Sequence, residues 1–97
     1  MEIFDLTGPV DFSPERHVSR SLAKTPLSAL SVIGWEPGQV SSIHFHPGAD
    51  EVYHVLQGEG LFDDGQRHVR LGPGHAVMFR AGAGRRRARR RPSRVAG

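Results

Sequence analysis

Residues 37–58 read PGQVSSIHFHPGADEVYHVLQG, and five of them follow the spacing G-x5-H-x-H-x4-E-x6-G. The two histidines are His44 and His46, the acidic residue is Glu51, and Gly38 and Gly58 are the turn glycines that bound the pattern. Residues two apart on a β-strand point to the same face, so both imidazoles can face one cavity. The spacing therefore predicts one metal ion held by two imidazoles and a carboxylate.

The residues around the acidic ligand predict a second strand that folds back beside the first. Residues 47–50 have the composition of a tight turn, and the run EVYHVL that follows is rich in β-branched and aromatic residues. Alternation from Glu51 places Tyr53 and Gln57 on the pocket side, with His54 on the other face. The Tyr53 hydroxyl is then a candidate for supporting the ligands or contacting a substrate, and the alternative is an aromatic ring that fills the barrel.

Two histidines and one carboxylate with open coordination positions suit non-haem Fe(II). Nitrogen and oxygen ligands also admit Mn, Ni, Cu or Zn, so the predicted cofactor is a divalent transition metal of undetermined identity. The chain has no cysteine, which excludes thiolate ligands. It has six histidines, and the alternative is that those of the pattern are ordinary surface residues.

The five-residue pattern resembles the first motif of the cupins, small β-barrels that hold a metal between histidines. The resemblance covers about residues 30–84 and continues through GEG at 58–60, DDG at 63–65, LGPG at 71–74 and the apolar run AVMF at 76–79. It implies an all-β fold, a cupin-like β-barrel or double-stranded β-helix of the jelly-roll type. Cupins are often dimers, so a homodimer is expected as well.

The second motif of similar cupins, P-x-G-x2-H-x3-N, is broken in this chain. Gly82 stands where the motif has glycine, but Arg80 replaces the proline, Arg85 the histidine and Arg89 the asparagine. An arginine stays protonated and has no lone pair for a metal, so Arg85 is no substitute ligand. The predicted site is reduced to the three ligands of the first motif.

The chain length predicts one domain, and the composition changes at its C-terminus. We expect an irregular arm over residues 1–15, with one turn of helix from Pro14, and a β-barrel over residues 16–84. Residues 85–97 are expected to be a disordered arginine-rich tail, because RRRARRRPSR does not alternate apolar and polar residues. Such a tail would leave the C-terminal edge of the barrel incomplete.

The positive charge of the chain is concentrated in that tail. Residues 1–84 carry six basic and ten acidic side chains, whereas residues 85–94 alone carry seven arginines. Three interpretations stay open: an arm that binds a polyanion such as nucleic acid, a solvated tail without a partner, and a coding sequence whose frame shifts near residue 83 or 84. The candidate polyanion contacts are Arg85, Arg86, Arg87, Arg89, Arg90 and Arg91.

Two classes of function follow from the resemblance. One is a metal-dependent enzyme of the oxygenase or isomerase kind that acts on a small molecule at the predicted metal. The other is a non-catalytic module that binds or senses a small molecule, or a degenerate cupin that has lost the metal. The N-terminus lacks a secretory signal and no apolar stretch reaches membrane-spanning length, so the sequence predicts a cytoplasmic protein without a membrane partner.

Overall fold

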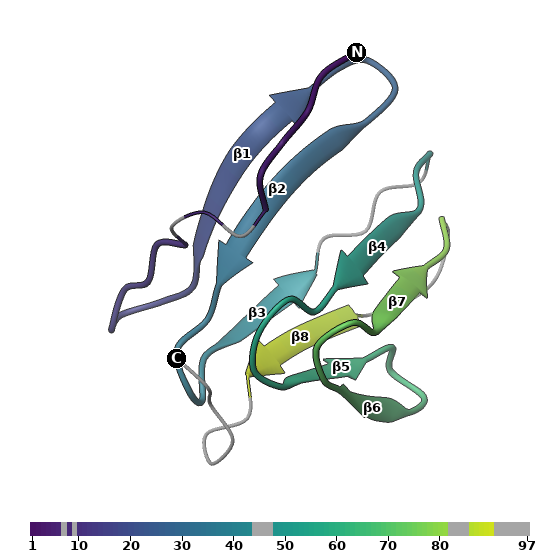
Figure 1. Ribbon diagram of the computed structural model, residues 1–97. Helices are drawn as coiled ribbons and strands as arrows, with labels where there is room; N and C mark the ends of the chain where they lie inside the picture. Colours follow the sequence, from purple (N-terminus) through teal and green to yellow (C-terminus); the bar gives the residue numbers. More distant parts are fainter. Residues whose placement is uncertain (7, 9, 44–47, 82–85, 91–97) are drawn as a thin grey trace.

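A computed structural model describes residues 1–6, 8, 10–43, 48–81 and 86–90, with the backbone alone for residues 42, 43 and 86–90 (Figure 1). Every regular element among these residues is a β-strand, which confirms the predicted all-β class. The strands are β1 (Val18–Lys24), β2 (Ala29–Gly34), β3 (Val40–Ile43), β4 (Glu51–His54), β5 (Gly60–Asp63), β6 (His68–Leu71), β7 (Ala76–Phe79) and β8 (Arg86–Arg90).

The strands form three antiparallel sheets. One has four strands in the order β3-β8-β5-β6, and the other two are the pairs β4-β7 and β1-β2. Figure 1 shows the β1–β2 hairpin to one side, with the remaining strands gathered on the other. Both β3 and β5 pair with β8, a strand far from them in sequence, so non-local pairing builds the largest sheet.

The core lies where the β4–β7 pair meets the four-stranded sheet. Its buried hydrophobic residues are Val55, Phe62 and Phe79, with the two phenylalanines only 5% and 4% exposed. The ring of Tyr53 on β4 contacts Phe62 on β5, with a centroid distance of 5.8 Å, and meets Phe79 on β7 edge-on at 6.0 Å. Aromatic packing therefore joins the two sheets at this point.

The N-terminal arm packs against the end of β2. Gly34 is buried, and a Cβ at this position would collide with the backbone oxygen of Asp11 and lie 2.9 Å from Cγ1 of Val10. The side-chain amide of Gln39 also donates a 2.6 Å hydrogen bond to the backbone oxygen of Ser13. The predicted helical turn from Pro14 was wrong, because residues 14–16 form a bend instead.

Our expectation of disorder from residue 85 onward was wrong for residues 86–90, and so was the barrel boundary at residue 84. These residues form β8, which lies inside the four-stranded sheet with Ala88 in register with Ser41 of β3 and Phe62 of β5. The physical reason is that backbone N–H and C=O groups make a β-ladder, and arginine supplies them as any residue other than proline does. Residues 85 and 91–97 lie outside the described chain.

Candidate metal centre

The predicted ligands come from the connection between β3 and β4. Strand β3 ends at Ile43 and β4 begins at Glu51, so the sequence places His44 and His46 on the segment that joins two different sheets. Both histidines fall outside the described residues, and their predicted role as ligands stays a prediction. Glu51 is the one predicted ligand whose surroundings the structure describes.

The Glu51 side chain is half-buried and held by a neighbouring hydroxyl. The hydroxyl of Tyr53 donates a 3.2 Å hydrogen bond to Oε2 of Glu51, and Oε1 of the same carboxylate is shielded from solvent. Because its ring packs against Phe62 and Phe79, Tyr53 offers that hydroxyl from a constrained position. A carboxylate fixed in this way is suited to ligate a metal. The two alternatives for Tyr53 are compatible, because its ring packs in the core while its hydroxyl bonds Glu51.

Strand alternation around this carboxylate agrees with the sequence pattern up to the end of β4. Glu51 and Tyr53 are half-buried, while Val52 and His54 are exposed. Gln57, which we expected on the pocket side, is exposed instead. The reason is that β4 ends at His54 and the chain then bends, so period-two alternation no longer determines the direction of residue 57.

The two glycines that bound the motif both have left-handed backbones. The φ angle is 83° at Gly38 and 72° at Gly58, a region that L-residues with a side chain rarely adopt. The chain turns into β3 after Gly38 and into β5 after Gly58. Glycine at both positions is therefore explained by backbone geometry at the turns on either side of the segment that carries the predicted ligands.

Sequence reasoning missed Asp50, the residue immediately before the predicted carboxylate ligand. Its Oδ1 accepts a 2.7 Å hydrogen bond from the backbone N–H of Ala81, which is 31 residues away and follows β7. No local pattern could have revealed this bond, because it depends on β4 and β7 pairing with Glu51 opposite Phe79.

Among the described residues, no group of three histidine, aspartate or glutamate side chains lies close enough to hold a metal ion. Four candidate arginines of the tail, Arg86, Arg87, Arg89 and Arg90, are described through the backbone of β8 alone, whereas Arg85 and Arg91 lie outside the described residues. Arg87 is in register with Asp63 of β5. In the part of the chain that the structure describes, no helix is long and apolar enough to cross a membrane.

The four-stranded sheet and the β4–β7 pair that packs against it define the class of small β-barrels. The chain belongs to the cupin family: residues 24–91 match the cupin domain. This match extends through β8, in agreement with its place inside the sheet. No curated protein matches the chain.

Two solved structures are similar to the chain over nearly its whole length. The first is the TT1209 protein from Thermus thermophilus, which is 30% identical with a TM-score of 0.81, over 96% of this chain and 87% of that one. The second is the conserved SPY1581 protein of unknown function from Streptococcus pyogenes, which is 23% identical with a TM-score of 0.71, over 97% of this chain and 80% of that one. The second likeness shows the fold alone.

Proposed function

We propose that this cupin binds a divalent transition metal through His44, His46 and Glu51, and that it binds or acts on a small molecule there. The observation that carries the proposal is the state of Glu51: a half-buried carboxylate with one oxygen held by Tyr53 and the other enclosed. The two histidines precede it at the spacing of the first cupin motif. A half-buried carboxylate that a neighbouring hydroxyl holds in place is suited to present an oxygen to a metal, which supports a metal at this place.

The chemistry of the donor set fits such a metal. Two imidazole nitrogens and a carboxylate oxygen suit Fe, Mn, Ni, Cu or Zn and leave coordination positions for a small molecule. When bound, the metal would supply Lewis-acid or redox chemistry of the oxygenase or isomerase kind. The task of the chain itself is to keep both imidazoles neutral, to present the Glu51 carboxylate and to hold it with the Tyr53 hydroxyl.

A binding module without turnover is the second candidate. It is favoured by Arg85, which occupies the position of the second-motif histidine and cannot ligate a metal. The two candidates differ in the fate of the small molecule. An enzyme converts a bound small molecule to product, whereas a binding module releases it unchanged, and mass spectrometry of a ligand incubated with metal-loaded protein separates the two.

The metal is tested by elemental mass spectrometry of the purified protein beside His44→Ala and His68→Ala variants. His68 is an exposed residue on β6, so its replacement is a matched control that removes one imidazole elsewhere. We expect near-stoichiometric metal in the wild type and in His68→Ala, and little in His44→Ala. Equal metal contents in all three proteins, or a wild type that cannot be loaded, would contradict the proposal.

A further inference from the structure

Two connections run between the four-stranded sheet and the β4–β7 pair, and their end residues are cross-strand partners. The first joins Ile43 of β3 to Glu51 of β4 and carries the predicted histidine ligands. The second joins Phe79 of β7 to Arg86 of β8, and it carries the broken second motif. Ile43 is in register with Arg86 and Glu51 is in register with Phe79, so both connections cross between the sheets at the same end of the barrel.

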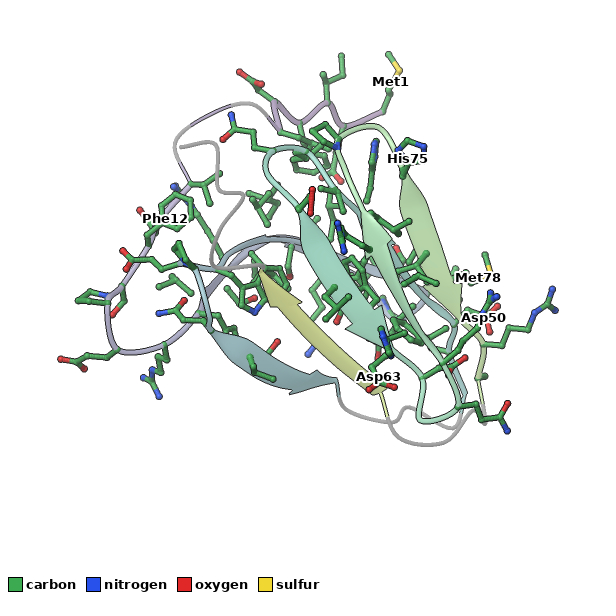
Figure 2. All side chains as sticks on the ribbon, turned by 90° about the horizontal axis from the view of Figure 1, so that it is seen from below. Met1, Phe12, Asp50, Asp63, His75 and Met78 are labelled. Atoms are coloured by element: carbon green, nitrogen blue, oxygen red, sulfur yellow. The ribbon has the colours of Figure 1, made fainter. Side chains whose placement is uncertain are left out.

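A side chain of the first connection is bonded to the second. The Asp50 carboxylate accepts the backbone N–H of Ala81 at 2.7 Å, within the range of a well-formed N–H···O hydrogen bond. Figure 2 shows Asp50 near Met78, beside the end of the β4–β7 pair. The bond extends the link between β4 and β7 beyond the last paired residues, Glu51 and Phe79.

The Asp50–Ala81 bond and the Tyr53 bond flank Glu51 in the sequence. Tyr53 lies two residues after Glu51 and holds its carboxylate through Oε2. Asp50 lies one residue before it and holds the backbone where β4 begins. Strand ends fray unless such a contact closes them, and fraying at this end would move the Glu51 backbone. Glu51 is therefore flanked in the sequence by a side-chain contact on one side and a backbone-anchoring contact on the other.

We propose that Asp50 is a positioning residue for the metal site, because its bond to Ala81 fastens the ligand-bearing connection to the segment after β7 and so holds Glu51 in place. This inference rests on the proposed function. Asp50 acts here as a hydrogen-bond acceptor, and its negative charge and any direct contact with the metal are not part of the role.

The test measures Co²⁺ binding to the metal-free full chain by visible absorption and calorimetry. Asp50→Ala removes the acceptor and the charge, whereas Asp50→Asn keeps an acceptor oxygen and removes only the charge. Asp63→Ala is the matched control, because it also removes one aspartate and one hydrogen bond from a backbone N–H. That bond is the one that Asp63 Oδ1 accepts from the Gly65 N–H at 2.8 Å. Asp63 lies on β5 in the four-stranded sheet, whereas Asp50 precedes β4 of the other pair.

We expect Asp50→Ala to weaken Co²⁺ binding about tenfold, the lower end of the range for residues that orient metal ligands, and to alter the Co²⁺ absorption spectrum. Asp50→Asn should restore both to within about twofold of the wild type, and Asp63→Ala should leave them unchanged. Weakening in Asp50→Asn equal to that in Asp50→Ala would assign the effect to charge and overturn the inference. So would an Asp50→Ala variant that binds as the wild type does.

These outcomes separate the inference from the proposed function. If His44→Ala abolishes Co²⁺ binding and Asp50→Ala does not change it, the proposed metal site is supported and the positioning role of Asp50 is contradicted. If the wild type binds no Co²⁺, the proposed function fails and the inference fails with it.

Discussion

Tyr53 combines two roles at the scale of a single residue, and substitutions can separate them. Tyr53→Phe keeps the ring against Phe62 and Phe79 but removes the hydroxyl that bonds Glu51. We expect it to lower the free energy of unfolding by about 1 kcal/mol, the value of one hydrogen bond. Tyr53→Ala should cost about 2 to 3 kcal/mol, below the loss for a fully buried aromatic because Tyr53 is half-buried.

Chemical unfolding of the metal-free proteins checks this difference, and Co²⁺ titration provides the second readout. Tyr53→Phe should weaken metal binding about tenfold despite its small effect on stability. Equal stability losses in the two variants would show that the ring contacts contribute little.

Gly34 is the residue at which the close approach of the N-terminal arm can be tested. A Cβ there would meet Asp11 and Val10, whereas a Cβ on Gly72 would meet no atom within 4 Å. We expect Gly34→Ala to destabilise the protein by about 1 to 3 kcal/mol through overpacking, and Gly72→Ala to change stability by less than about 0.5 kcal/mol. Both substitutions restrict the unfolded chain similarly, so their difference in thermal or chemical unfolding isolates the contact with the arm.

At the scale of elements, the β5–β6 turn is closed by a carboxylate. Oδ1 of Asp64 accepts the backbone N–H groups of Arg67 and Gln66, both at 2.9 Å. The bond from Arg67, followed by that from Gln66, lowers the pKa of Asp64 below its ordinary value. A lowered pKa in the folded state means that the ionised carboxylate stabilises the turn above its unfolded-state pKa, and that this stabilisation is lost as pH falls through the folded-state pKa.

We therefore expect the Asp64 carboxyl in the folded protein to titrate at lower pH than in a peptide of residues 62–68. Carboxyl carbon shifts in NMR spectra of the two samples give both midpoints. The amide signals of Gln66 and Arg67 in the protein should move with the same midpoint as the carboxyl. Identical midpoints in protein and peptide would show that the turn does not bind the ionised form preferentially.

At the scale of the whole molecule, much apolar surface remains exposed on the single chain. Val52 and Met78 are cross-strand partners on β4 and β7 and are 59% and 54% exposed. The outer face of this pair, formed by Val52, His54, Ala76 and Met78, includes no Asp, Glu, Lys or Arg, so two copies can approach without charge repulsion.

We predict a homodimer that buries this face. Size-exclusion chromatography with light scattering should give twice the mass of the chain for the wild type, and the single-chain mass for a Val52→Lys, Met78→Lys double variant. Leu27→Lys is the control, because Leu27 is 97% exposed at the end of the β1–β2 hairpin. A monomeric wild type, or a double variant that remains dimeric, would contradict the prediction.

The sequence by itself determined the local features of this protein. Period-two alternation predicted the β4 strand and placed His54 on the face opposite to Glu51 and Tyr53, and the glycine positions predicted the turns at Gly38 and Gly58. Ligand spacing and family resemblance led to the cupin class, which the match over residues 24–91 confirmed. Each of these features depends on a residue and its near neighbours, so the linear order of residue types was sufficient.

Only the tertiary structure decided the contacts between distant segments. It placed the arginine-rich residues 86–90 inside a sheet, bonded Asp50 to Ala81, and packed the arm on Gly34. It also ended β4 early enough to expose Gln57. Backbone hydrogen bonds and close packing join residues that are far apart in the chain. The residue types of one segment do not specify which distant segment it will pair with, so these contacts could not be predicted locally.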